Sequence, residues 1–507
     1  MPAIDRRAFL STAALGAAGL GSPRVLRGAS AKGPNVLFFF VDDLRVQLGC
    51  YGRTAVKSPN IDRLAAGGTL FARAYCQQAV CAPTRASVLS GLRPDGTGIY
   101  DLEHPLRTMD KNVVTLPQFF RARGYETVTI GKVYHHYNDD KENWSRQPQV
   151  KGAQYVLPET QEYLRKRTEE GRAKGLTGTA LSRFARGPAT ECADVPDEAY
   201  ADGGIAAAAI EQLRELRDKP FFLCCGFLKP HLPFCAPKRY WDLYQREQFA
   251  VSPRKKPDDM PPIALGDFGE LRAYTDIPNV GPLDDEGTQR LIHGYHAAVS
   301  FTDAQVGKVL AELERLGLAD NTIVVIWGDH GWKLGEYGSW CKHTNFELDT
   351  HVPLIVRGPG IAAGQRRDEI VEMLDVYPTL ADLTGAQPPA HCQGASLRPL
   401  LKPGASAAPE WKNFALSQYP RGQDGPVMGY SLRWDRWRYT EWVHRDGRTL
   451  ARELYDHAAS DVASANVVDK PEHAALTRQL SARIRPFVKT RWDVFARPGA
   501  GKARDRA

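Results

Sequence analysis

The sequence predicts an α/β fold with a large, mostly parallel central sheet and a small antiparallel unit near the C-terminus. Two apolar runs rich in β-branched and aromatic residues, 35–41 and 322–327, fit strands buried on both faces of a parallel sheet. Segments with helical spacing of apolar residues separate the strands. At 507 residues the chain exceeds one simple core, so we expect one large and one smaller domain.

The remaining elements follow from local signals. Thr115 is a natural N-cap and Gly124 a natural stop for a helix between them. The polar stretch 137–196 is predicted to be a long excursion over the surface, without assignable chemistry. A hairpin across Trp434-Asp435 and a terminal helix indicate the small antiparallel unit. The other expected helices and strands are 204–216, 294–316, 127–130, 220–226, 429–433, 436–442 and 453–456. We expect a catalytic domain over 32–405 and a C-terminal subdomain over 406–507.

The N-terminus reads as an export signal. Arg6-Arg7 is followed by an apolar segment and by a mild Ala/Gly/Leu run, and 29–31 offer small residues for cleavage. This order is typical of a twin-arginine signal covering 1–31, and it predicts a periplasmic or secreted protein. The alternative is a basic amphipathic N-terminal helix.

The composition is that of an ordinary globular enzyme, with 43% hydrophobic and 25% charged residues. The formal net charge of +7 is weak evidence for acidic partners, and we expect no nucleic-acid partner. After the leader no apolar run is long enough to span a bilayer. The nine cysteines lack the regular spacing of a disulfide framework or a zinc site.

Metal-capable side chains follow both strong strands. Asp42 and Asp43 end the first strand, and Asp329 and His330 end the second. Because ligands of open α/β sheets bind at the carboxyl ends of strands, we expect these four residues to meet if the strands are neighbours. Three carboxylates and one imidazole suit Ca²⁺ or Mg²⁺ better than zinc. The alternative for each acid is helix capping with solvent exposure.

A candidate nucleophile stands at the start of a helix, in Cys81-Ala82-Pro83-Thr84-Arg85. Pro83 suits a first helical turn, so Cys81 is placed where backbone N–H groups and the helix dipole favour anions. Arg85, one turn on, can point back toward the same spot. The alternative is a buried cysteine before an ordinary helix.

Other strand ends supply candidate basic groups. Lys132 and His135 follow the strand at 127–130, and Lys342 lies after the second acidic pair. His231 stands between Pro230 and Pro233, which hold it in a rigid extended segment, so it is a candidate general acid. A structural histidine is the alternative. Two lysines, an arginine and a divalent cation together form a receptor for a compact anionic ester.

These motifs resemble those of the type I sulfatases of the alkaline-phosphatase superfamily, and within them most closely the iduronate-2-sulfatases. Cys81 to Arg85 matches the Cys-x-Pro-x-Arg sulfatase motif. The resemblance runs from about Pro34 to the Asn466 region. Thr84 replaces the usual Ser, and the segment after His135 also departs from the pattern. The other matching segments are Val41 to Arg45, Gly131 to His135, Lys229 to Phe234, Asp329 to Trp332, Lys342 to Phe346 and Ser417 to Arg421.

The resemblance implies an alkaline-phosphatase-like fold and a formylglycine made from Cys81 by a formylglycine-generating enzyme. As its hydrate, this group attacks sulfur and later expels sulfate. Arg85 and His135 would steady the hydrate, Lys132 and Lys342 would hold the sulfate oxygens, and His231 would protonate the leaving alcohol. The expected substrate is a sulfated carbohydrate, with the 2-O-sulfate of a uronate as the specific expectation. The implied ligands of Ca²⁺ are Asp42, Asp43, Asp329, His330 and the modified Cys81.

Two other functions stay open at this point. The first is hydrolysis of phosphate esters or phosphonates, because sulfate and phosphate esters share their shape. The second is binding of polyanionic glycans by a degenerate site, which predicts an unmodified Cys81 and binding that is lost in salt.

Overall fold

The computed structural model describes residues 33–136, 139–404, 410–422 and 426–489. The predicted export signal at 1–31 lies outside these residues. Within the described ranges, no helix combines the length and the apolar character needed to cross a membrane.

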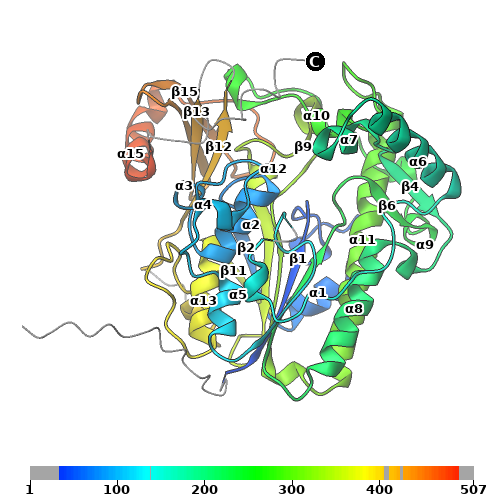
Figure 1. The fold of residues 1–507 in the computed structure, drawn as a ribbon. Coiled ribbons are helices and arrows are strands. Elements are labelled where there is room, and N and C mark those ends of the chain that lie inside the picture. Colours follow the sequence, from blue (N-terminus) through cyan, green and yellow to red (C-terminus); the bar gives the residue numbers. More distant parts are fainter. Residues whose placement is uncertain (1–32, 137–138, 405–409, 423–425, 490–507) are drawn as a thin grey trace, which may run out of the picture.

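A seven-stranded sheet forms the centre of the molecule, in the order β11-β2-β10-β7-β1-β5-β3 (Figure 1). All strands run in one direction except β10, which is antiparallel to both of its neighbours. The predicted mostly parallel sheet is therefore confirmed. The strands are β1 (Asn35–Val41), β2 (Thr69–Tyr75), β3 (Glu126–Gly131), β5 (Phe221–Phe227), β7 (Thr322–Gly328), β10 (His351–Arg357) and β11 (Gln365–Glu372).

Helices cover both faces of this sheet, which explains why the central strand β1 is apolar throughout. Leu37 and Phe39 of β1 pack toward α1, α8 and α11, whereas Phe38 and Phe40 pack toward α2, α5 and α13 (Figure 1). The side chains of a strand alternate between the two faces, so both sets must be apolar. The helices are α1 (Pro59–Ala66), α2 (Cys81–Ser90), α5 (Leu116–Arg121), α8 (Ala201–Glu215), α11 (Asp285–Arg315) and α13 (Val376–Leu383).

The C-terminal part forms an antiparallel sheet in the order β12-β13-β14-β15, with α15 (Ala474–Ile484) against it (Figure 1). Its hairpin turn is Asp435-Arg436, one residue later than predicted, and Asp435 takes the left-handed conformation with φ of 50°. The fold class is thus confirmed, while the boundary at 405–406 stays a prediction. The strands are β12 (Phe414–Arg421), β13 (Val427–Trp434), β14 (Trp437–His444) and β15 (Thr449–Asp456).

The small sheet is joined to the segment that leads into α2. Ser417 Oγ donates to the carbonyl of Cys76 at 2.6 Å, and the amide of Gln418 donates to the carbonyl of Gln77 at 2.8 Å. These bonds tie β12 to the segment that follows β2 and leads to Cys81, at positions five and four residues before it.

The segment 137–196, which was predicted only as a long surface excursion, contains secondary structure that the sequence analysis did not predict. This segment contains α6 (Pro158–Ala173), α7 (Gly178–Phe184) and the short strand β4 (Thr190–Ala193), which pairs with β6 (Phe234–Pro237). Arg165 of α6 forms ion pairs with Glu162 and Glu169, three and four residues away. Such pairs stabilise a helix that has few apolar residues, and the apolar spacing used for prediction does not detect them.

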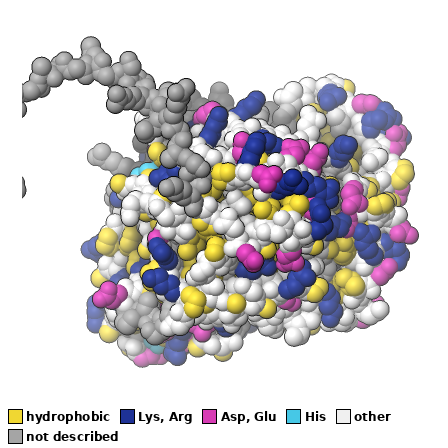
Figure 2. Space-filling model, turned by 90° about the horizontal axis from the view of Figure 1, so that it is seen from below, with side chains coloured by type: hydrophobic (Ala, Val, Ile, Leu, Met, Phe, Trp, Pro, Cys, Tyr) yellow, Lys and Arg dark blue, Asp and Glu magenta, His cyan; other side chains and the backbone are white. Residues whose placement is uncertain are grey.

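Short elements complete the described fold. They are α3 (Pro94–Thr97), α4 (Leu106–Met109), α9 (Lys238–Trp241), α10 (Gly269–Arg272), α12 (Glu347–Thr350), α14 (Arg398–Leu401), β8 (Lys333–Leu334) and β9 (Trp340–Cys341). On the face shown in Figure 2, basic and acidic side chains are interspersed, and hydrophobic side chains form small groups between them. This mixture is typical of the exposed surface of a globular domain.

The buried carboxyl of Glu453 predicts how stability depends on pH. Its oxygens accept hydrogen bonds from Trp442 Nε1 and the Tyr455 hydroxyl, each at 2.6 Å, but burial raises its pKa from 4.5 to about 7. Because the folded state holds this proton more tightly, the free energy of unfolding should fall as the pH rises from about 4.5 to about 7. Glu453→Gln should therefore raise the Tm at about pH 8, by the equivalent of roughly 1–3 kcal/mol, and change it little at about pH 5. A Tm difference that is the same at both pH values, measured by differential scanning calorimetry, would contradict this prediction.

Candidate active site

The ends of β1 and β7 meet as predicted. The two strands are adjacent and parallel, with Val41 opposite Gly328. The amide of Asp43 donates to Asp329 Oδ1 at 3.0 Å, and His330 Nε2 lies 3.4 Å from Asp43 Oδ1. The side chains of Asp42, Asp43, Asp329 and His330 are all buried. The alternative of solvent-exposed caps is therefore wrong for these acids.

Two glycines allow the second strand end to come this close. A Cβ atom on Gly328 would lie 2.1 Å from the carbonyl oxygen of Leu44, and one on Gly331 would lie 1.9 Å from that of Leu348. Real Cβ atoms do not approach backbone so closely, so both positions require glycine.

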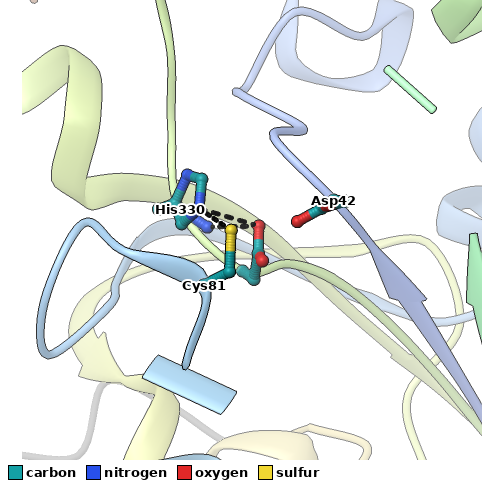
Figure 3. A group of neighbouring side chains, drawn as sticks. Asp42, Cys81 and His330 are labelled. Carbon is teal, nitrogen blue, oxygen red and sulfur yellow. Dashed lines mark hydrogen bonds and ion pairs between the residues drawn. The ribbon is translucent and has the colours of Figure 1, made fainter. Parts of the chain in front are cut away.

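Cys81 lies at the first position of α2 and points into the acidic cluster. Its sulfur is 3.3 Å from His330 Nε2, and one ligand atom from each of Asp42, Cys81, Asp329 and His330 lies within 4.8 Å of the others. Figure 3 shows the Cys81 sulfur facing the His330 ring, with the Asp42 carboxylate directed toward the same space. Burial, followed by the charge of Asp42, raises the pKa of the Cys81 thiol well above its ordinary value.

The donor set of this cluster fits a hard divalent cation. Three carboxylates are concentrated in one buried place, and burial raises the pKa of Asp43 to about 7 even though Lys342 and His330 lie beside it. A carboxylate in this condition lacks compensating positive charge. Ca²⁺ and Mg²⁺ take oxygen ligands, and a single imidazole among them is acceptable.

Arg85 forms hydrogen bonds to two acids of the cluster. Its Nε donates to Asp329 Oδ2 at 2.9 Å and its Nη2 to Asp42 Oδ1 at 3.2 Å, while Nη1 donates to the carbonyls of Lys132 and Val133. The side chain is fully buried. Most of its donors are therefore used to join the ends of three strands, which makes Arg85 a positioning group in the first instance.

Two lysines flank the acids, as predicted. Lys132 Nζ contacts Asp42 Oδ2. Lys342 Nζ lies 3.1 Å from Asp43 Oδ1 and 4.8 Å from the centroid of the Trp332 ring. Trp332 itself is fully buried, so it packs in the core and does not form an exposed wall.

The backbone around these side chains takes an unfavourable conformation. Asp43, Cys341 and His343 have φ values of 60°, 66° and 82°, in the left-handed region that residues with a Cβ rarely adopt. Two of the three flank Lys342. Strain of this kind persists where the surrounding structure requires a particular side-chain placement, and it is concentrated at functional sites.

His231 comes close to the cluster and has a partner that sequence reasoning missed. Its Nδ1 lies 2.6 Å from the carbonyl of Leu232, and its Nε2 lies 2.9 Å from Glu270 Oε1 and 3.8 Å from Asp43 Oδ2. Glu270 also contacts Lys342 Nζ at 3.0 Å. It lies on the four-residue helix α10, in a polar stretch with no motif, so the sequence carried no signal for it.

His135 lines the same cavity as Asp42 and Lys132, but it makes no hydrogen bond or ion pair with any described residue. Burial and the charge of Lys132 lower its pKa to about 3, so the ring is neutral. The structure thus brings His135 to the wall of the site without a direct contact to Cys81.

A cavity of about 920 Å³ opens from this centre. Asp42, Lys132, His135 and His231 line one part of it, and residues of α6 and α7 line another. A buried charged cluster at the strand ends, open to a cavity of this size, is the expected arrangement of an active site.

Comparisons with known proteins agree with this assignment. Residues 34–386 match the family described as Sulfatase, and residues 335–490 match that described as N-sulphoglucosamine sulphohydrolase, C-terminal. Iduronate 2-sulfatase of Mus musculus is 34% identical over 525 residues, covering 88% of this chain and 93% of that protein.

Solved structures share the fold. One, a complex with its substrate D-glucosamine-2-N,6-O-disulfate, matches with a TM-score of 0.71 at 22% identity, over 90% of this chain and 97% of that chain. The phosphonate monoester hydrolase of Silicibacter pomeroyi matches with a TM-score of 0.70 at 21% identity, over 90% and 95%. The fold and the site thus define an alkaline-phosphatase-like hydrolase. The chain belongs to the sulfatase family and is a sulfuric ester hydrolase.

Proposed function

We propose that the protein hydrolyses sulfate esters of a sulfated sugar, specifically the 2-O-sulfate of a uronate, through a formylglycine made from Cys81. The observation that carries the proposal is the position of Cys81, at a helix N-terminus and within 4.8 Å of the acids and imidazole that end β1 and β7. The similarity to iduronate 2-sulfatase supports the specific substrate.

Asp42, Asp43, Asp329 and His330 would hold a divalent cation, for which we propose Ca²⁺, together with the modified residue 81. This cation would supply positive charge against the sulfate oxygens, and the aldehyde hydrate would supply a nucleophile that can release sulfate without a second attack at sulfur. Lys132 forms an ion pair with Asp42, and Lys342 forms one with Asp43, so the two lysines contact different acids of the cluster. We therefore assign them to the sulfate oxygens. Arg85 holds the strand ends together, and the neutral ring of His135 lines the cavity beside the cluster.

His231 is proposed to protonate the leaving alcohol, and Glu270 to position it. With Nδ1 bonded to the Leu232 carbonyl, Nε2 is the nitrogen that faces the site. Burial and the charge of Lys342 lower the pKa of His231. The Glu270 carboxylate at 2.9 Å opposes this shift and favours a proton on Nε2, which the leaving oxygen can take.

The role of His231 predicts a dependence on the leaving group. His231→Ala should lower kcat/KM for a sugar sulfate by about 100-fold or more, because a sugar alkoxide needs a proton to leave. The loss on 4-nitrophenyl sulfate, whose phenolate leaves unaided, should stay below about 10-fold. Glu270→Gln should show the same pattern more weakly. Equal losses on both substrates in steady-state kinetics would show that His231 is not the acid.

Hydrolysis of phosphorus esters is the second candidate, because the fold is shared with a phosphonate monoester hydrolase. Parallel kinetics on 4-nitrophenyl sulfate, 4-nitrophenyl phosphate and a phenyl phosphonate monoester separate the two. We expect the sulfate to have the largest kcat/KM, and desulfation in a panel of sulfated disaccharides to be fastest at a uronate 2-O-sulfate. A larger kcat/KM for either phosphorus ester overturns the proposal.

We further propose that residues 1–31 direct export to the periplasm or the medium. A formylglycine-generating enzyme is then the maturation partner, and it acts before export. The sequence Arg6-Arg7 and the small residues at 29–31 support the first proposal, and the Cys-x-Pro-x-Arg match at Cys81 to Arg85 supports the second.

A further inference from the structure

The cavity extends from the catalytic cluster to the two helices that sequence analysis missed. Gln161, Arg165 and Arg172 of α6 and Arg186, just after α7, line its outer part. Leu164 of α6 packs on the cluster that includes Ala297 and Phe301 of α11 (Figure 1). The outer part is thus anchored to the longest described helix.

The outer part of the cavity carries positive charge that the protein does not neutralise. Arg165 lies between Glu162 and Glu169, at 2.8 and 2.7 Å. Among the described residues, Arg172 and Arg186 have no carboxylate at ion-pair distance, although both line the cavity. Two cationic side chains therefore face this space without a counter-charge.

Neutral groups hold the Arg186 guanidinium in place. Its Nη1 donates to the Tyr274 hydroxyl at 2.8 Å, and its Cζ lies 4.9 Å from the centroid of the Tyr274 ring. Its Nε is buried without a hydrogen-bond partner in the described structure. A pre-positioned guanidinium whose Nη2 donates to no described residue is suited to bind a planar carboxylate or a sulfate.

We propose that Arg172 and Arg186 form a second anion subsite, which binds a carboxylate or sulfate on a sugar next to the one that carries the scissile ester. This inference rests on the proposed function, because a polysaccharide with anionic groups on successive sugars is the substrate that reaches both places. The subsite selects an oligosaccharide over a small ester, and it contributes binding without touching the reacting atoms.

Binding to an inactive protein tests the subsite directly. In Cys81→Ala, which cannot turn over, the Kd of a heparin-derived tetrasaccharide is measured by calorimetry with and without Arg172→Gln and Arg186→Gln. Each charge-assisted contact that is lost should weaken binding about 10-fold. Lys166→Gln, which removes one positive charge from the same helix outside the cavity lining, is the matched control and should leave Kd within about 2-fold. An unchanged Kd in the double variant, or no binding to Cys81→Ala itself, overturns the proposal.

Chemically edited ligands identify the anion. A tetrasaccharide with reduced carboxyl groups and one stripped of N- and 6-O-sulfates are compared against the double variant. The ligand that lacks the recognised group should bind the parent and the variant equally. If both edited ligands still bind Cys81→Ala more tightly than they bind the double arginine variant, the subsite accepts both carboxylate and sulfate. If neither edited ligand binds Cys81→Ala more weakly than the intact tetrasaccharide does, the proposal fails.

Activity on a small ester separates this proposal from the function on which it rests. In protein that retains Cys81, Arg172→Gln and Arg186→Gln should leave kcat/KM for 4-nitrophenyl sulfate within about 2-fold. The small ester does not reach the outer part of the cavity, and salt screens the charges of these side chains there. The KM for the tetrasaccharide should rise while kcat is kept. A wild type that is inactive on both the aryl sulfate and the tetrasaccharide would disprove the proposed function, whereas equal losses on both substrates in the variants would disprove only the subsite.

Discussion

Cys81→Ala is expected to abolish sulfate-ester hydrolysis, lowering kcat by about 1,000-fold or more, because it removes the proposed nucleophile. The position is at the start of α2 and the substitution removes only one heavy atom, so the Tm should change little. Cys392→Ala, a half-buried thiol near the C-terminal end of the same helix, is the matched control and should keep full activity. Undiminished turnover in Cys81→Ala would mean that another group attacks sulfur.

Cys81→Ser sharpens the same test. Serine can attack sulfur once, but its sulfate ester has no second hydroxyl through which sulfate can be expelled. We therefore expect at most a single turnover and a protein that gains the mass of one sulfuryl group. Mass spectrometry of the peptide that contains residue 81 should detect this adduct in Cys81→Ser. The same measurement should detect the expected aldehyde in the wild type.

Removal of the metal is the second large effect that we expect. A chelator should lower kcat/KM by about 100-fold or more, because three buried carboxylates would then face the sulfate oxygens without the cation. Added Ca²⁺ should restore the rate, and elemental analysis should find one ion per chain. Asp329→Asn should lose both the ion and the activity.

A second group of side chains provides the control for this experiment. Glu347, His351 and Asp461 also lie within 4.8 Å of one another. Glu347, however, is already paired with Arg433 and Arg438. Asp461→Asn should therefore retain the bound ion and the rate. Full activity after exhaustive chelation, with no metal found, would refute the metal site.

The residues at the centre of the candidate site could be predicted from the sequence alone. A strand buried on both faces must be apolar along its whole length, so 35–41 and 322–327 stand out, and the charged residues directly after them mark the strand ends. The placement of Lys132 also followed from a strand end, and that of His231 from rigid proline-flanked backbone, whereas no predicted element placed Lys342. Once β1 and β7 are neighbours, the meeting of their acids is unavoidable.

The outer site was not predictable in the same way. Glu270 reaches His231 from a four-residue helix whose position depends entirely on tertiary packing. Helix α6 buries few side chains and is stabilised by ion pairs such as Arg167 to Glu170, so its apolar pattern is weak. A search for opposite charges three and four residues apart would have found the helix, but not the cavity it lines.

The near-complete enclosure of residue 81 sets the order of events during biosynthesis. Only 2% of this side chain is accessible, and hydrogen bonds from β12 secure the segment just before it. The enzyme that we propose oxidises this thiol would therefore have to reach it on the nascent or still extended chain. Conversion would then compete in time with folding, and the fraction of active molecules would be fixed before folding is complete.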